Sequence, residues 1–134
     1  MKGKKSAGRS AKKSAAYAPM AFEPVLKKLD PAVLELIRRY PGAVYEKERT
    51  LDAKTKALIG VVMMTTLKVP NYQLKAQIGA ALQIGVTEQE VLEAIQMIIT
   101  VTGLPTFEYG LMAWADVVGA KELQPKGAVY SKLS

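Results

Sequence analysis

The sequence predicts an all-α fold, a compact multi-helix domain with orthogonal or bundle-like helix packing. Apolar residues recur at helical spacing along most of the chain, and helix start and stop signals separate these segments. No segment shows a convincing alternation of apolar and polar residues, which is typical of a half-buried strand. A length of 134 residues fits one domain with a single core.

Two short helices are expected at the beginning of the domain. Residues 22–29 have an amphipathic pattern. Asp30 offers a side chain that can cap a helix, and Pro31 suits the first helical position, which predicts a second helix over residues 32–40. The Pro-Gly pair that follows is expected to end this helix.

A central pair of helices is expected next. The first begins near Asp52, and its residues 59–64 are apolar nearly all round, so we expect it to be buried on several sides. The chain is interrupted before Asn71, because the preceding proline disfavours helical geometry in the residue before it and Asn is a good cap. The second helix is expected over residues 72–84, up to Gly85.

Two more helices complete the predicted domain. The first opens with a capping box at residues 87–90, in which the Thr hydroxyl and the second Glu side chain each satisfy a free backbone donor. The Gly103-Leu104-Pro105 segment is expected to end it. The last helix is expected over residues 106–119, with larger apolar side chains directed to the core: Leu111, Trp114, Val117 and Val118.

The net charge of +7 is concentrated in the N-terminal tail. The chain has 19 Lys and Arg residues and 12 Asp and Glu residues, and residues 1–16 hold six of the basic residues and no acid. The rest of the chain therefore has 13 basic and 12 acidic residues, a net charge of +1. We divide the chain into a flexible basic arm (residues 1–18), a helical domain (19–120) and a C-terminal arm (121–134).

The basic arm has interpretations that the sequence leaves open. It is either a segment that contacts nucleic acid or another polyanion, a targeting peptide, or a solubilising extension. Residues 1–16 lack aromatic side chains, which favours the solubilising role, since proteins that bind single strands stack bases on aromatic rings. The candidates for contact with a polyanion are Lys2, Lys4, Lys5, Arg9, Lys12 and Lys13.

The 134 residues contain no Cys and no His. This composition excludes disulfides, thiolate nucleophiles, imidazole acid–base catalysis and the usual zinc ligands. We therefore expect no metal and no cofactor. No apolar run approaches the roughly 20 residues that span a bilayer, and the tail lacks the apolar segment of a secretory signal, so we expect no membrane span and a cytoplasmic protein.

Three segments, taken in order, resemble a known family. The first is the run over residues 51–59, and the second is the pattern Ala-Leu-x-x-Gly-Val-Thr-x-x-Glu-Val-x-Glu-Ala over residues 81–94. Together with the Gly103-Leu104-Pro105 turn, they resemble the carboxymuconolactone decarboxylase family, which includes the alkyl hydroperoxidase D-like proteins. The resemblance covers roughly residues 30–118. It implies an all-helical fold that assembles as trimers or hexamers, with active sites near subunit contacts.

The catalytic groups of that family are missing from the matching positions. In the peroxidase-type members, the resemblance implies a relay of one Glu, two Cys and one His. On this sequence the Glu falls at or beside Ala57, the two Cys fall near Pro70 and at Gln73, and the His falls at Gln77. Decarboxylase-type members lack the cysteines but are similar in placing a His at the last position. Since none of these residues ionises, we expect no peroxidase mechanism.

Three polar residues remain at that location: Tyr72, Gln73 and Gln77. The two glutamines are four residues apart and therefore share one helical face. They are candidates for binding a small polar ligand through hydrogen bonds. The alternative places the glutamines on the polar face of an amphipathic helix, with the Tyr72 hydroxyl in water. Asp116 also stays open, since it either pairs with a lysine across an interface or faces solvent.

Two hypotheses for the function follow. The first is a carboxymuconolactone decarboxylase-like protein without the thiol and imidazole relay, which binds a small ligand or runs a divergent reaction. The second is a non-enzymatic scaffold whose basic arms contact nucleic acid or another polyanion. In both, we expect a homo-oligomer, because the apolar faces are too large for a small monomer: Met63, Met64, Ile98, Ile99 and Val101. The resemblance implies that this oligomer is a homo-trimer or homo-hexamer.

Overall fold

The computed structural model describes residues 20–46 and 49–120, which contain helices and no strand. The prediction of an all-α fold is therefore confirmed. The two predicted arms, residues 1–18 and 121–134, lie outside the described residues, and so do the six candidates for contact with a polyanion. The helices are α1 (Glu23–Leu29), α2 (Pro31–Pro41), the π-helical turn η1 (Gly42–Glu46), α3 (Ala53–Thr66), α4 (Asn71–Gln83), α5 (Glu88–Met97), α6 (Ile99–Thr102) and α7 (Leu104–Val118).

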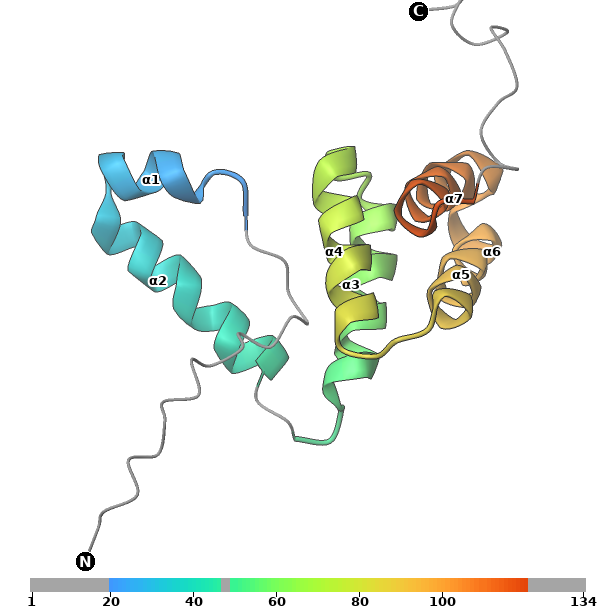
Figure 1. Ribbon diagram of the computed structural model, residues 1–134, viewed down its shortest axis with the longest axis horizontal. Helices are drawn as coiled ribbons and strands as arrows, with labels where there is room; N and C mark the ends of the chain where they lie inside the picture. The colour runs from blue at the N-terminus through green and yellow to red at the C-terminus, as the bar shows by residue number, and fades with distance from the viewer. Residues whose placement is uncertain (1–19, 47–48, 121–134) are drawn as a thin grey trace, which may run out of the picture.

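Helices α3 and α4 form the central pair of the molecule (Figure 1). On one side of this pair, α5 and α7 pack against both helices, and the short α6 contacts α5 and α7. On the other side, α1 and α2 form a hairpin that stands apart from the remaining helices (Figure 1). The turn η1 contacts both α2 and α3, so it connects the hairpin to the body of the protein.

The core lies between α3, α4, α5 and α7. Its fully buried apolar side chains come from all four helices and the turn before α5: Ala57, Val61, Leu74, Ile78, Ala81, Val86, Val91, Ile95 and Ala113. Gly110 of α7 allows a close approach of the helices. A methyl group at this position would lie 2.6 Å from Cγ2 of Thr65 and 2.9 Å from Cγ2 of Ile95. The absence of a side chain therefore determines how closely α7 packs against α3 and α5.

Most of the predicted helix starts are present. A carboxylate oxygen of Asp30 accepts a hydrogen bond from the Val33 amide at 3.1 Å, as expected for the cap of α2. Asp52 caps α3 by accepting from the Thr55 amide at 2.7 Å. The capping box of α5 is also confirmed. The Thr87 hydroxyl accepts from the Glu90 amide at 3.1 Å, while the Glu90 carboxylate accepts from the Thr87 amide at 2.7 Å.

One expectation about helix ends is confirmed and one is wrong. The α-helix α2 ends at the Pro-Gly pair, as expected, with Gly42 as its C-cap. Gly42 keeps right-handed helical geometry, so the chain continues directly into the π-helical turn η1. Asn71 is the first residue of α4, and Pro70, with extended geometry, occupies the cap position.

The predicted helix that follows the capping box is broken into α5 and α6 at Ile98. The break begins a run of five β-branched residues, 98–102, which lose side-chain freedom in a helix. The Thr100 hydroxyl donates to the Met97 carbonyl at 2.8 Å, and the Thr102 hydroxyl donates to the Ile98 carbonyl at 3.0 Å. These bonds engage carbonyl groups near the break. The last helix also begins earlier than expected, at Leu104, because Pro105 suits its first turn.

Burial differs from the expectation in two helices. The central α3 is not covered on all sides, since Ile59 is 41% exposed and Met63 is 47% exposed. In α7 the fully buried apolar side chains are small, because Ala113 and Ala115 lie where neighbouring helices approach. Trp114 and Val117 are only partly buried against the core. Within the described residues, no helix combines the length and apolar character needed to cross a membrane.

Candidate functional site

The site is centred on Gln77, a polar residue of α4 that is fully buried. Its amide group lies over Gly60 of α3, and a methyl group at Gly60 would be 2.9 Å from Nε2 of Gln77. The same methyl group would be 3.4 Å from the hydroxyl oxygen of Tyr45 in η1. Three consecutive elements, η1, α3 and α4, therefore bring an amide and a phenol to one point on α3.

Gly60 makes this arrangement possible. It is buried within an otherwise apolar segment of α3, where a glycine costs about 0.5–1 kcal/mol of stability relative to alanine. Any larger residue would occupy the space that the Gln77 amide fills. The glycine therefore allows a long polar side chain to enter the seam between α3 and α4.

Tyr45 is half-buried, and this burial raises the pKa of its hydroxyl above the ordinary value of 10.0. The hydroxyl is consequently protonated near neutral pH. A neutral phenol can donate one hydrogen bond and can also accept hydrogen bonds. The Tyr45 hydroxyl is thus a hydrogen-bonding group beside the Gln77 amide rather than a base.

Lys56 fixes η1 against α3. Its ammonium group donates a hydrogen bond to the Val44 carbonyl at 2.8 Å. Lys56 lies one helical turn before Gly60, and Val44 directly precedes Tyr45 in the chain. The contact therefore holds the segment that carries the phenol next to α3.

The other two predicted ligand-binding residues are at the beginning of α4. The Gln73 amide nitrogen donates to the Tyr72 hydroxyl over 3.4 Å, at the long end of hydrogen-bond distances. Gln73 is half-buried, whereas Tyr72 is 56% exposed. The three candidates thus differ in burial: Gln77 is buried, Gln73 is half-buried and Tyr72 is exposed. The alternative that places both glutamines on a polar outer face does not describe Gln77, which is buried.

The four positions that the family resemblance implies all lie on α3 and at or near the start of α4. Ala57 is a fully buried core residue, Pro70 caps α4, and Gln73 and Gln77 follow at half and full burial. None of these side chains can exchange a proton near neutral pH. The arrangement can orient a polar group through hydrogen bonds, but it offers no nucleophile and no acid–base pair of the relay type.

The acidic candidate Asp116 pairs within its own chain. Its carboxylate lies 2.8 Å from the Lys75 ammonium, so the pair connects α7 to α4. Asp116 is exposed, as the solvent-facing alternative expected, and it also forms an ion pair with a lysine of its own chain. Within the described residues, no group of three or more Asp, Glu, His or Cys side chains is placed to hold a metal ion.

Sequence reasoning missed three residues of this site: Tyr45, Lys56 and Gly60. One signal for Gly60 was present, because a glycine interrupts the apolar run of α3 without ending the helix. No comparable signal existed for Tyr45. It lies between a predicted helix and a predicted mixed-charge turn, and only the packing of η1 against α3 brings it to Gln77.

Fold and site together define a small all-helical protein with a buried amide–phenol cluster and, in these 134 residues, no thiol or imidazole. The chain belongs to the carboxymuconolactone decarboxylase family, whose sequence profile matches residues 31–116. The match extends from α2 into α7 and includes every residue of the cluster. It confirms the family that the order of motifs indicated. No curated protein matches the chain.

Proposed function

We propose that this protein is a ligand-binding member of the carboxymuconolactone decarboxylase family that holds a small polar molecule beside Gln77 and does not run the thiol-dependent peroxidase reaction. The observation that supports the proposal is the complete burial of Gln77 at the position where relatives with an imidazole keep it. Burying an amide is costly unless it forms hydrogen bonds, so a fully buried glutamine with polar neighbours is typical of a site with a specific task.

The chemistry of the cluster favours a ligand with hydrogen-bond acceptors. The Gln77 amide and the Tyr45 hydroxyl supply N–H and O–H donors, and the Lys56 ammonium is bonded to the Val44 carbonyl, next to Tyr45 in the chain. A carboxylate or a polarised carbonyl matches these groups better than a cation does. We therefore propose a small carboxylate or lactone as the class of ligand.

The absence of reactive groups supports a binding role rather than peroxide reduction. A peroxidase of this family type needs a thiolate for attack on the peroxide, and these 134 residues contain no Cys. Glutamine cannot replace the imidazole in a proton relay, since its amide does not titrate near neutral pH. We expect no hydroperoxide reduction with a dithiol donor.

The test is a titration of the full chain with benzoate, followed by NMR of the glutamine side-chain amides, with methyl benzoate as the uncharged comparison. The proposal expects the Gln77 amide signals to shift with benzoate and to shift less with the ester. Gln77→Leu is expected to abolish the saturable binding, and Gln83→Leu, on the exposed side of the same helix, to retain it.

Two results would contradict the proposal. One is saturable benzoate binding that is unchanged in Gln77→Leu, which would place the ligand elsewhere. The other is turnover of a hydroperoxide well above the buffer rate that disappears in Gln77→Ala, since this would make Gln77 part of a reaction. Circular dichroism of each variant verifies that the helices are retained.

A further inference from the structure

We propose that the C-terminal segment of this chain, residues 121–134, runs back along α7 and covers an exposed apolar patch around α6. The α6 patch consists of Met97 at the end of α5, Val101 in α6 and Leu104 at the start of α7. Three properties support this occupant: the exposure of the patch, the charge around it, and the length and sequence of the segment that follows α7. The segment itself lies outside the described residues.

The α6 patch is open in the described part of the chain. Val101 is 85% exposed, the highest value among the large apolar side chains described, and Met97 and Leu104 are 72% and 65% exposed. The three residues follow one another at intervals of four and three positions, and α6 contacts both α5 and α7. Neighbouring apolar side chains at this level of exposure are typical of an interaction surface.

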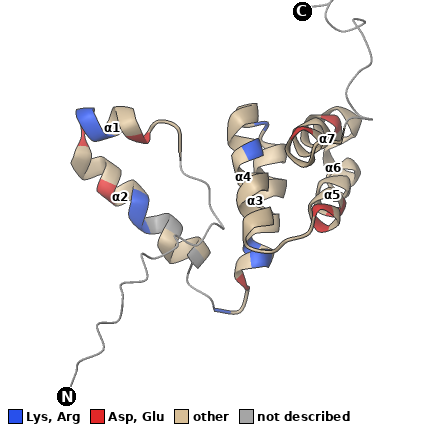
Figure 2. Ribbon diagram, viewed as in Figure 1, with Lys and Arg blue, Asp and Glu red and all other residues tan. Residues whose placement is uncertain are grey.

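The helices that carry the patch have charge of one sign. Residues 76–120 contain five acidic residues and no Lys or Arg, and Figure 2 shows red but no blue on α5 and α7. Glu93 lies one helical turn before Met97, and Glu108 lies one turn after Leu104, so both carboxylates border the α6 patch. Both are exposed, and neither has an ion-pair partner within the described residues. An apolar occupant with positive charge at its edges therefore fits the patch.

Lysines of the neighbouring elements do not neutralise this acidic rim. Lys75 of α4 is already paired with Asp116 at 2.8 Å. Lys68 lies in the turn before α4, where the Val69 carbonyl accepts a hydrogen bond from the Tyr109 hydroxyl of α7. Although this turn is close to α7, Lys68 forms no ion pair with a described carboxylate. The rim is therefore available to a basic segment.

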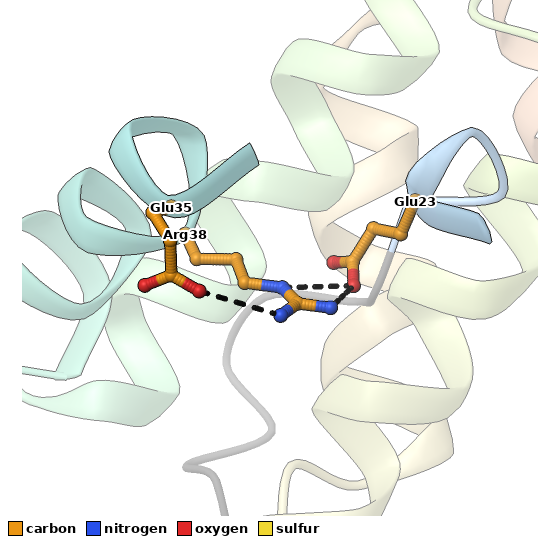
Figure 3. A network of polar contacts seen from close by, with 3 residues as sticks. All are labelled: Glu23, Glu35 and Arg38. Atoms are coloured by element: carbon orange, nitrogen blue, oxygen red, sulfur yellow. Dashed lines mark hydrogen bonds and ion pairs between the residues drawn. The ribbon is translucent and has the colours of Figure 1, made fainter. Parts of the chain in front are cut away.

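The hairpin of α1 and α2 also exposes apolar side chains, but its charges are mixed and paired internally. Arg38 of α2 contacts the Glu23 carboxylate of α1 through two nitrogens, at 2.8 and 3.1 Å, and it lies 3.8 Å from Glu35 of its own helix (Figure 3). The hairpin therefore does not indicate the charge of an occupant, whereas the α6 patch does.

The C-terminal segment combines apolar and basic side chains as the patch requires. Three apolar side chains lie within five positions: Val129, Tyr130 and Leu133. The charged residues are three lysines and one acid: Lys121, Lys126, Lys132 and Glu122. The basic N-terminal arm does not fit, because residues 1–16 have no large apolar side chain after Met1. That arm also precedes the hairpin, which lies across the central pair from α6 (Figure 1).

The segment is long enough to reach the patch. Helix α7 has 15 residues and is therefore about 22 Å long. Gly119, in left-handed geometry with φ 74°, ends this helix, and Ala120 is the last described residue. An extended chain advances about 3.3 Å per residue, so about seven residues lead back to Leu104. Residues 121–127 supply this length, and the three apolar side chains that follow then lie beside the patch.

The test is methyl NMR of the full chain with labelled methionines, which include Met97 in the patch and Met63 on α3. A soluble gadolinium chelate broadens the signals of methyl groups that face water. In the wild type, the Met97 methyl is expected to be protected from broadening and to show a nuclear Overhauser contact with the Tyr130 ring. Both are expected to be lost in V129S/Y130S/L133S, while the signal of Met63, which is 47% exposed, stays unchanged.

Two further variants test the sequence requirement and the charge requirement. Leu123→Ser, in the same segment but outside the three apolar positions, is the matched control and is expected to keep Met97 protected. K126E/K132E is expected to reduce the protection, since it places acidic side chains beside Glu93 and Glu108. Adding E93K/E108K to that chain is expected to restore the protection, because opposite charges then face each other again. Circular dichroism verifies that each variant keeps its helices.

A mixed sample separates the chain's own segment from that of a second copy. Labelled V129S/Y130S/L133S is mixed with unlabelled wild type, and Met97 of the labelled chain is expected to stay broadened. Protection in this mixture would place the segment on another copy and overturn the proposal. Met97 signals that are equally broadened in wild type and variant would mean that the patch is open. Equal protection in both would mean that another surface covers it, and either result also overturns the proposal.

Discussion

Gln77 and Gly60 fit together across the seam between α4 and α3. The amide nitrogen of Gln77 occupies space that a methyl group at Gly60 would approach to 2.9 Å, and Tyr45 from η1 lies at the same point. Because Gln77 is fully buried, its position depends on the missing side chain of Gly60. This dependence gives a direct way to perturb the cluster without changing any polar group.

Gly60→Ala is therefore expected to move the Gln77 amide and to leave the global stability nearly unchanged. The alanine adds about 0.5–1 kcal/mol of helix propensity, and the contact with the amide offsets a similar amount. NMR signals of the Gln77 side chain report the displacement, and urea unfolding reports the stability.

Gly79→Ala is the matched control for this variant. Gly79 also lies inside a helix, but a methyl group there would meet no atom within 4 Å. It is expected to stabilise the protein by about 0.5–1 kcal/mol and to leave the Gln77 signals in place. Equal gains in stability for both variants, with unchanged amide signals, would mean that Gly60 does not determine the position of Gln77.

Gly110→Ala is expected to destabilise the protein by about 1–3 kcal/mol, because the added methyl group would overpack the core. It would lie 2.6 Å from Cγ2 of Thr65 and 2.9 Å from Cγ2 of Ile95, and both neighbours are fully buried branched side chains. Urea unfolding of the variant and of the wild type measures the difference.

A second substitution tests whether contact with Thr65 causes the loss of stability in Gly110→Ala. Thr65→Ser removes the nearest methyl group and keeps the hydroxyl that donates to the Val61 carbonyl at 2.8 Å. The double variant Gly110→Ala/Thr65→Ser is expected to recover part of the loss. If the two changes are simply additive, the contact between positions 110 and 65 is not responsible.

The capping box of α5 should make stability depend on pH. The Thr87 amide donates to the Glu90 carboxylate at 2.7 Å, and this hydrogen bond to the charged form holds the pKa of Glu90 below its ordinary value of 4.5. A lowered folded pKa gives a stabilisation that is fully present above the unfolded pKa. It is lost as the pH falls through the folded pKa.

Unfolding of Glu90→Gln and wild type at two pH values checks this expectation. The wild type should be the more stable protein at pH 7, and the difference should shrink as the pH falls well below the ordinary glutamate value of 4.5, toward the lowered pKa of Glu90. A difference that stays constant between the two pH values would show that the ionised carboxylate does not stabilise the helix start.

The ion pair between Lys75 and Asp116 is expected to contribute less than about 1 kcal/mol. Its atoms are 2.8 Å apart, but both side chains are more than a third exposed, so water screens the attraction. A double-mutant cycle with Lys75→Met and Asp116→Asn measures the coupling, and its value should fall further at high salt. A larger coupling that resists salt would indicate that the pair is shielded from water, as in an assembled form.

Local signals in the sequence accounted for much of the fold. The caps at Asp30, Asp52 and Thr87 depend on side chains that bond to backbone donors three residues away, and these contacts are the same in any fold that contains the helix. The positions of the helices followed from these caps and from apolar spacing. At residues 98–102, the apolar spacing favours one continuous helix, whereas the β-branched side chains disfavour it. The sequence pattern predicted one helix here, and the structure has two.

The site was only partly predictable. The motif order identified α4 and its residue Gln77. The position of Gln77 follows from the residue spacing along a helix that the family and this chain share. Tyr45 and Lys56 could not be found in this way, since their contacts depend on how η1 packs against α3 and α4, which no local pattern reports. Tyr45 reaches Gln77 through the packing of η1, and Lys56 holds that turn through a backbone carbonyl.

By itself, the sequence determined that this protein is helical, where most of its helices begin, which family it resembles, and which reactions its lack of Cys and His excludes. These properties depend on residue type and on short-range spacing. The tertiary structure decided that Gln77 is buried while Tyr72 is exposed, and that the hairpin leaves its apolar face uncovered. Whether a side chain is buried depends on neighbours that come from other parts of the sequence. Only the packing of the helices could therefore decide it.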